Sequence, residues 1–305
     1  MGIGSKTAQF LMELTREKPF SGSVVTLGVQ DLLFNTHSLL EIARRADYAS
    51  PQLQLLASAP AARATDRQLF QTLGFSEVVR TDVDAFEGAD FLLDLNCADG
   101  LPDAYRERFD CVLDGGTLEH VFHVPNALKN IFLLLKAGGR VIHFSPTNNY
   151  VDHGFYSFSP TFFVDFYTEN EFIIDRCVLV AHTRNVEGED WIAGEYSPGV
   201  LDDVEFGGLD DRLYLTFFVA TKTEKSTFDR FPQQGAYKRV WSQGGYQQSQ
   251  AAYEQRRRDR DATAKRPEWL QTRFDHIAQR SERLAKWLHR PSERKDFPIA
   301  RARRY

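Results

Sequence analysis

The sequence has few cysteines and no long apolar run. Its three cysteines, Cys97, Cys111 and Cys177, are too few and too scattered for a disulfide framework or a zinc cluster, so we expect them to be reduced. No segment is apolar for long enough to be a secretory signal or a membrane span, and Lys6 stands where a myristoylation motif has Ser or Thr. These absences predict a protein without membrane attachment, located in the cytoplasm.

Charge is divided unevenly along the 305 residues. Residues 1–224 contain 17 Lys and Arg against 33 Asp and Glu, and residues 225–305 contain 20 against 9, which gives net charges of −16 and +11. A polar stretch with Gly, Pro and Gln begins where the strand-like patterns stop. We therefore predict a main domain over residues 1–224 and a basic, mainly helical extension over residues 225–305.

Within the extension, apolar residues recur at helical spacing from Leu270 to Leu288, after Pro267. This pattern predicts an amphipathic helix that packs on the main domain or on a second copy of the chain. The basic runs 256–261 and 300–305 could suggest a nucleic-acid contact. Their Asp interruptions and the acidic main domain argue against a broad phosphate-binding face, so we expect no nucleic-acid partner.

Strand-like and helix-like runs alternate through the main domain, which is typical of an open α/β sheet. The last two predicted strands could form an antiparallel, hairpin-like edge. The predicted helices cover 5–17, 35–46, 67–75 and 124–139, and the predicted strands cover 23–29, 76–83, 89–95, 109–115, 140–146, 171–182 and 213–222.

Acidic residues stand at the ends of three successive predicted strands: Asp82, Asp94 and Asp114. Asp is common in turns, so any one of them could simply mark a turn. Because ligands of open α/β sheets bind beyond the carboxyl ends of the strands, the three acids together predict one crevice. There an acid after the second strand suits a ribose diol, and one after the third can accept from an adenine amino group.

Two segments carry a family resemblance. "FDCVLDGGTLEHV" (109–121), followed by "LLLKAGGRVIHF" (133–144), resembles the class I S-adenosylmethionine (SAM)-dependent methyltransferases, and the likeness extends over roughly residues 20–222. It implies a Rossmann-like sheet of seven strands, mostly parallel with an antiparallel last strand, and SAM as the cofactor of a methyl-transferring enzyme. The implied cofactor-binding residues are Gly28, Gln30, Asp31, Asp82, Asp94, Leu95, Asp114 and Gly115.

The first-strand motif departs from this family. Where the family has an acid and three glycines, this chain reads "TLGVQDL" (26–32), and of the three glycine positions only Gly28 keeps glycine. Gln30 and Leu32 occupy the other two, which predicts a reshaped loop because glycine allows the backbone to approach a ligand closely. Either SAM still binds, through the side chains of Gln30 and Asp31, or the pocket has changed purpose; we expect binding.

Methyl transfer depends mostly on positioning, which supplies about 7–11 kcal/mol, but a hydroxyl acceptor also needs a base. Histidine suits this role because its pKa of about 6.5 lies near neutrality. Glu119 and His120, which are expected to begin the helix after the fourth strand, are candidate catalytic residues together with His153. We predict that His120 shapes the cofactor pocket and that His153, in the long loop after the fifth strand, is the base.

That loop, "SPTNNYVDHGFYSFSP" (145–160), is rich in aromatic residues. It could be a plain surface connection, but surface loops seldom carry so many aromatic side chains without burying them. We predict a wall or lid over a polyhydroxylated or heteroaromatic acceptor. Its predicted substrate-binding residues are Asn149, Tyr150, Asp152, Phe155 and Tyr156, with Asn148 beside them.

A metal site is a further alternative. Glu119, His120 and His123 have spacings that can share one helix face, and Asp152 or His153 could complete a ligand set. Neither an HExxH motif nor a cysteine signature accompanies them, so we expect no bound metal.

Together these patterns predict a biosynthetic SAM-dependent methyltransferase that O-methylates a small polar acceptor, such as a sugar or a secondary metabolite. Two alternatives stay open. One is an N-methyltransferase or another SAM-using enzyme. The other is a non-catalytic relative of the methyltransferases that serves as a partner subunit.

Overall fold

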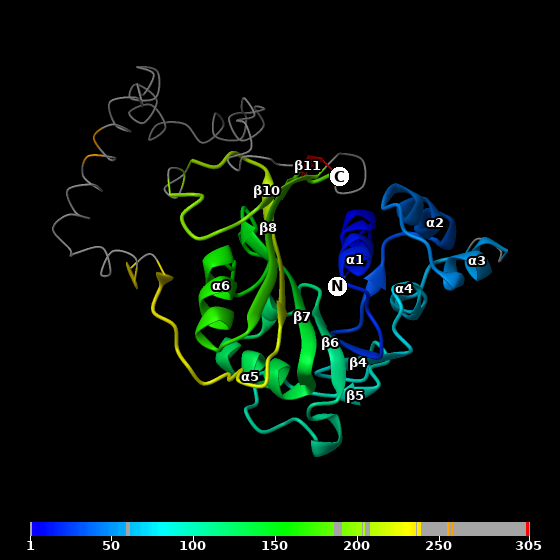
Figure 1. Cartoon of the computed structure of the whole chain (residues 1–305), viewed down its shortest axis with the longest axis horizontal. Coiled ribbons are helices and arrows are strands. Elements are labelled where there is room, and N and C mark those ends of the chain that lie inside the picture. The colour runs from blue at the N-terminus through cyan, green and yellow to red at the C-terminus, as the bar shows by residue number, and fades with distance from the viewer. Residues whose placement is uncertain are drawn as a thin grey trace, which may run out of the picture.

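The computed structural model describes residues 2–58, 62–185, 191–202, 204, 208–235, 237–238, 255, 258 and 303–304. These residues form one large sheet with helices on both faces (Figure 1). The helix predicted between Leu270 and Leu288 and most of the basic extension lie outside this range, so the domain division stays a prediction. In the described part of the chain, every helix is too short or too polar to cross a membrane.

The sheet has nine strands in the order β11-β9-β8-β10-β7-β6-β2-β4-β5. Five neighbouring strands pair in parallel, and β10 is antiparallel to both β7 and β8. This confirms the predicted Rossmann-like sheet with an antiparallel last strand. The strands are β2 (Ser23–Leu27), β4 (Glu77–Asp82), β5 (Phe91–Leu92), β6 (Phe109–Asp114), β7 (Leu135–Asn148), β8 (Ile173–His182), β9 (Ile192–Glu195), β10 (Leu213–Thr221) and β11 (Arg303–Arg304).

Two strands of the large sheet were not predicted, and the predicted place of one strand was wrong. β9 and β11 extend the sheet beyond β8, which raises the seven strands to nine. β8 and β10 do pair in antiparallel fashion, but β10 lies inside the sheet between β7 and β8 and not at its edge. Long-range pairing decides such placement, and it leaves no local signal in the sequence.

Helices cover both faces of the sheet (Figure 1). Successive residues of a strand point to opposite faces, so Val24 of β2 joins one apolar core and Val25 joins the other. A short sheet of β1 (Gly2–Ile3) and β3 (Asp31–Leu32) lies beside the first core. That core packs α1 (Ser5–Glu17), α2 (Thr36–Arg45), α3 (Pro51–Ala57) and α4 (Asp66–Thr72), and the second packs α5 (Val124–Leu134) and α6 (Pro160–Glu169).

The predicted helix 124–139 is too long at its C-terminal end. α5 ends at Leu134, and β7 begins at the next residue. Gly138 has a φ of +80°, and its amide donates to the carbonyl of Lys222 at 2.8 Å, while the amide of Lys222 donates to the carbonyl of Gly139 at 2.9 Å. The two glycines therefore pair the start of β7 with the end of β10 and do not cap a helix.

The turn after β6 is held by a buried chain of polar groups. The Asp114 carboxylate accepts from the amides of Thr117 at 2.8 Å and Leu118 at 3.1 Å. Its other oxygen lies 2.7 Å from Nδ1 of His143 on β7, and Nε2 of His143 lies 2.7 Å from the hydroxyl of Tyr167 on α6. Because Asp114 and His143 are fully buried, these bonds replace the water that the groups lose on folding.

Tyr167→Phe should lower the free energy of unfolding by about 1–3 kcal/mol, because it leaves Nε2 of the buried His143 without its partner. Urea denaturation followed by circular dichroism measures the change. The matched control is Tyr156→Phe, whose hydroxyl donates to the Phe122 carbonyl at the surface and whose loss should cost under about 0.5 kcal/mol. Equal losses in the two variants would show that the buried chain adds no stability.

Candidate functional site

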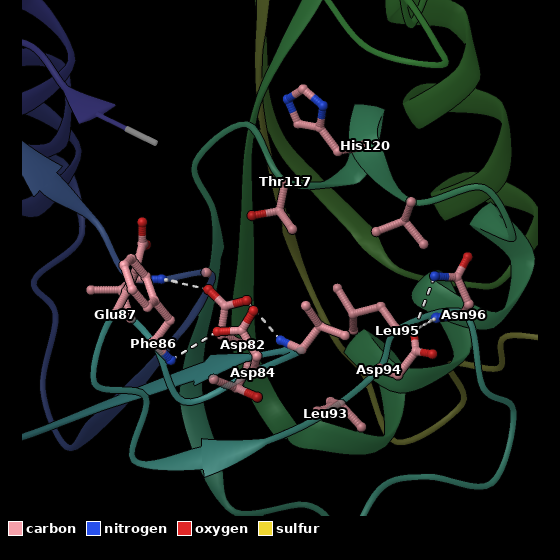
Figure 2. Close-up of a pocket in the computed structure, with 15 residues that line it drawn as sticks. Asp82, Asp84, Phe86, Glu87, Leu93, Asp94, Leu95, Asn96, Thr117 and His120 are labelled. Carbon is pink, nitrogen blue, oxygen red and sulfur yellow. Dashed lines mark hydrogen bonds between the residues drawn. The ribbon is translucent and has the colours of Figure 1, made fainter.

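A cavity of about 390 Å³ opens at the carboxyl ends of the central strands (Figure 2). This volume falls within the range of about 300–1,000 Å³ that is usual for small-molecule sites. Its walls come from the segments that follow β2, β4, β5 and β6. The lining residues are Gly28, Val29, Thr81, Asp82, Val83, Asp84, Phe86, Glu87, Leu93, Asp94, Leu95, Asn96, Thr117, His120 and Val121.

Asp82, the last residue of β4, lies on the cavity wall as the sequence predicts. One carboxylate oxygen accepts from the amide of Val83 at 2.7 Å and the other from the amide of Val29 at 3.4 Å (Figure 2). The second contact ties the loop after β2 to the end of β4. Since a carboxylate offers about four acceptor sites, Asp82 keeps capacity for a ligand.

Asp94 and Leu95 form the wall after β5, also as predicted. The Asp94 carboxylate accepts from the backbone amide of Asn96 at 2.9 Å and from its side-chain amide at 3.0 Å. These bonds hold the pKa of Asp94 below its ordinary value, so it is ionised at neutral pH. Leu93 and Leu95 are buried and give this wall an apolar surface next to the charge.

Sequence reasoning missed several lining residues. Thr117 bridges two strand ends, because its hydroxyl donates to the carbonyl of Leu27. Thr117 belongs to the "GGTLEH" segment, but no sequence pattern there indicates that Thr117, more than its neighbours, lines a cavity. Phe86 is 93% exposed at the rim, and an aromatic side chain soon after a strand-end acid was an available signal. The missed residues are Val29, Thr81, Val83, Asp84, Phe86, Glu87, Leu93, Asn96, Thr117 and Val121.

Two acids predicted to bind the cofactor lie elsewhere. Asp114 is fully buried in the polar chain to His143 and does not line the cavity. Asp31 belongs to β3, and its carboxylate pairs with Arg63 at 3.1 Å. Asp114 and Asp31 therefore differ from Asp82 and Asp94, whose carboxylates accept from backbone amides and still line the cavity.

Gln30 fills space that the family leaves open over the strand ends. Its side chain is buried, and Nε2 donates to the carbonyls of Leu27 at 3.1 Å and Gly28 at 3.2 Å. Oε1 lies against Gly115 and has no hydrogen-bond partner within the described part of the chain. Gly28 keeps a φ of +75° and lines the cavity, whereas Gln30 and Gly115 lie behind its wall.

Three predicted catalytic residues converge beside the cavity. Glu119 and His120 belong to the 3₁₀ turn η2 (Leu118–His120) and not to the start of α5, which begins at Val124. Nε2 of His153 lies 3.7 Å from Oε1 of Glu119, and the rings of His120 and His153 are 5.2 Å apart. Figure 2 places His120 well apart from Asp82 and Asp94, so the cavity has an acidic end and a histidine end.

Burial dominates the electrostatics of this group. The Glu119 side chain is 2% exposed, and burial together with the charge of Asp114 raises the pKa of Glu119 to about 8. Burial and the neighbouring His153 lower the pKa of His120. His123 lies outside the group, because its Nδ1 accepts from the amide of Asn126 and caps α5.

The loop after β7 rests on η2. The carbonyl of Glu119 accepts from the amides of Phe155 at 2.8 Å and Tyr156 at 3.3 Å. A methyl group added at Gly154 would lie 2.8 Å from that same carbonyl, so the contact leaves no room for a side chain. The loop is therefore fixed to the turn that carries Glu119 and His120.

None of the five predicted substrate-binding residues lines the cavity. Asn149 donates to the carbonyls of Asp210 and Arg212. The Tyr150 hydroxyl lies 2.7 Å from Nε2 of His182, and burial raises the pKa of Tyr150. Phe155 is 65% exposed and packs edge-on against Phe122. Asp152 is exposed, and the Tyr156 hydroxyl donates to the Phe122 carbonyl.

No family model matches the chain, and no curated protein matches it. Among solved structures it is similar to a SAM-dependent methyltransferase from Thermotoga maritima, at 15% identity over 71% of this chain and 92% of that one, with a TM-score of 0.35. It is also similar to phosphoethanolamine N-methyltransferase 2 of Haemonchus contortus, at 12% identity over 71% and 52%, with a TM-score of 0.36.

A third similar structure is a protein assigned as a Zn-dependent alcohol dehydrogenase from Rhodobacter sphaeroides, at 15% identity over 46% of this chain and 48% of that one, with a TM-score of 0.28. The chain thus spans about half the length of the second and third structures. The fold assignment rests on the strand order and directions described above.

Gly115→Ala should lower the free energy of unfolding by about 1–3 kcal/mol, because the added methyl group would lie 2.4 Å from Oε1 of Gln30. Urea denaturation of Gly115→Ala, Gln30→Ala and the double variant forms a cycle. Gly115→Ala should cost about 1 kcal/mol less in the Gln30→Ala background than in the wild type. The same cost in both backgrounds would mean that Gln30 does not fill the space over Gly115.

Proposed function

We propose that this protein is a SAM-dependent methyltransferase. The observation that carries the proposal is the cavity at the carboxyl ends of β2, β4, β5 and β6, with the Asp82 and Asp94 carboxylates on its walls. The sheet around it has the strand directions that the methyltransferase resemblance implies. The crevice at the strand ends is also where open α/β sheets bind their ligands.

The cavity residues fit the nucleoside half of SAM. Asp82 has free acceptor sites at the end of β4, which suit the two hydroxyls of a ribose. Leu93 and Leu95 offer an apolar wall for a purine ring, and the ionised Asp94 beside them can accept from its amino group. Two acids and an apolar wall in one cavity therefore support an adenosine site.

The amino-acid tail of SAM meets a different environment from that of the family. Gln30 takes up room where the family has glycine. Its Oε1 lies behind the cavity wall and has no donor among the described residues, so it would accept from the ammonium group of the tail if the side chain turned toward the cavity. The residues thus remain compatible with SAM, in a reshaped tail region.

SAM, when bound, supplies an electrophilic methyl group, whose bond to sulfur breaks as the bond to the acceptor oxygen forms. The chain must hold the acceptor in line and remove the proton of its hydroxyl. His120 lines the histidine end of the cavity with Glu119 and His153 beside it, and the two imidazoles offer acceptor atoms for that proton, His153 Nε2 foremost. The exposed Phe122 and Phe155 beside them can cover the acceptor and exclude water.

This arrangement favours O-methylation of a small polar molecule, such as a sugar or a secondary metabolite, in a biosynthetic pathway. A group of proton acceptors is most useful to a hydroxyl, which loses its proton as it is methylated. An amine acceptor is the alternative, since a protonated amine must also lose a proton before it reacts.

A non-catalytic partner subunit is a second candidate, and one observation favours it. Gln30 is held by two hydrogen bonds in the space where the family has a bare backbone. If this filling excludes the tail of SAM, the domain keeps the fold without the activity.

Isothermal titration calorimetry with SAM and S-adenosylhomocysteine tests the proposal directly, and we expect both to bind. Asp82→Ala should weaken SAM binding roughly 10- to 150-fold, the equivalent of about 1.5–3 kcal/mol for hydrogen bonds to a charged group. The matched control is Asp31→Ala, because Asp31 pairs with Arg63 away from the cavity and its loss should leave the affinity unchanged. No heat with either ligand in the folded wild type would favour the partner-subunit alternative.

The methylated atom can be identified with SAM that carries a ¹³C-labelled methyl group. The protein is incubated with panels of hydroxyl-bearing and amine-bearing small molecules, and the products are examined by carbon NMR. We expect the label on an oxygen-bound carbon. A label bound to nitrogen would replace the O-methylation proposal with the N-methylation alternative.

A further inference from the structure

Three potential metal ligands meet at the histidine end of the cavity. Glu119 and His120 come from η2, and His153 comes from the loop after β7. One ligand atom from each lies within 4.8 Å of the others. They are the Glu119 carboxylate and the two imidazoles, a set distinct from the Asp82 and Asp94 end of the cavity.

One oxygen of the buried Glu119 carboxyl group lacks a hydrogen-bond partner among the described residues. Its side chain is 2% exposed, and Oε2 makes no hydrogen bond to any described residue. Oε1 lies 3.7 Å from Nε2 of His153. A carboxyl oxygen without a partner is costly to bury, and a bound cation would pair with the ionised form of Glu119.

The spacing is close to that of a bound ion. Ligands about 2.1 Å from a tetrahedral metal lie about 3.4 Å from one another. The Glu119 and His153 atoms, at 3.7 Å, already approach this value. His120 and His153 are both exposed, so small rotations of their side chains can close the remaining distance.

The surroundings hold the ligands in place. The carbonyl of Glu119 binds the amides of Phe155 and Tyr156, which fixes the loop that carries His153. The ring of Tyr150 lies 5.5 Å from that of His153 and limits its movement on one side. Outer contacts of this kind orient the ligands of metal sites in general.

We propose that Glu119, His120 and His153 bind one divalent transition-metal ion of the zinc type, with an open position toward the cavity. Two imidazoles and one carboxylate are the donor set of catalytic zinc sites that keep a place for water or substrate. This proposal revises the expectation from the sequence that no metal binds. In the sequence His123 is the histidine that shares a helix face with Glu119, but the fold brings His153 to Glu119 instead.

The ion would also deepen the proposed function, and this part rests on the methyl transfer proposed above. A metal-bound hydroxyl loses its proton more easily, as zinc-bound water does with a pKa of about 7. The acceptor oxygen then forms its bond to the methyl carbon, the bond from that carbon to sulfur breaks, and the hydroxyl proton passes to water. His153 would act as a ligand in this state and not as the base.

Calorimetry of the chelator-treated full chain with Zn²⁺ tests the binding, and Co²⁺ provides a spectroscopic check. We expect one ion per chain, and visible absorption bands of Co²⁺ with nitrogen and oxygen ligands. Loss of any one ligand should weaken Zn²⁺ binding by at least about 10²-fold, as tested with His120→Ala, His153→Ala and Glu119→Gln. Residues that only orient a ligand typically change metal affinity by about 10–100-fold, so a larger effect identifies a ligand. The matched control, His123→Ala, should bind like the wild type because His123 caps α5.

Circular dichroism confirms that each variant is folded, and the exposed His120 and His153 make their alanine variants informative even if Glu119→Gln is unstable. Unchanged Zn²⁺ affinity in the folded His120→Ala and His153→Ala variants, or no binding by the wild type, would overturn the proposal. SAM titration of the same samples separates the two proposals. Zn²⁺ binding without SAM binding removes only the proposed function, and SAM binding without a metal site removes only this inference.

Discussion

The contact between Asp114 and His143 fixes the start of the turn that follows β6. A carboxylate and an imidazole, both fully buried, lie 2.7 Å apart between two neighbouring strands. The same carboxylate fixes the amides of Thr117 and Leu118, so the turn that carries Thr117 and His120 to the cavity is set from inside the sheet. Burying these groups is costly, and their complete hydrogen bonding is what makes the arrangement stable.

Glu119 joins the histidine end of the cavity to the loop after β7 through its backbone and its side chain. Its carbonyl holds the loop after β7, its carboxylate faces His153, and the next residue, His120, lines the cavity. One turn of three residues thus positions both the His120 wall of the cavity and the loop after β7. The acidic end of the cavity is built separately, on the ends of β4 and β5, where Asp82 and Asp94 take their hydrogen bonds from nearby residues.

Local patterns predicted the features that local forces decide. The bounds of α1 follow from an apolar face at helical spacing, and Asp82 and Asp94 follow from their place at strand ends. Asp114 has the same sequence signature, yet its partner lies 29 residues away, so no local pattern could show that it is buried. The sequence around Gly138 predicts a helix cap, and only the pairing with Lys222 shows that it belongs to a strand. The contact between His153 and Glu119 also depends on tertiary structure.

The place of β10 inside the sheet has a consequence for how the chain folds. β8 is synthesised before β10 but lies outside it, so β8 cannot join the sheet until residues 213–221 have left the ribosome. Until then β7 presents an open edge, of the kind that pairs with other chains and leads to aggregation. β10 therefore joins the interior of the sheet late, and its pairings with β7 and β8 join segments far apart in the sequence, which slows folding.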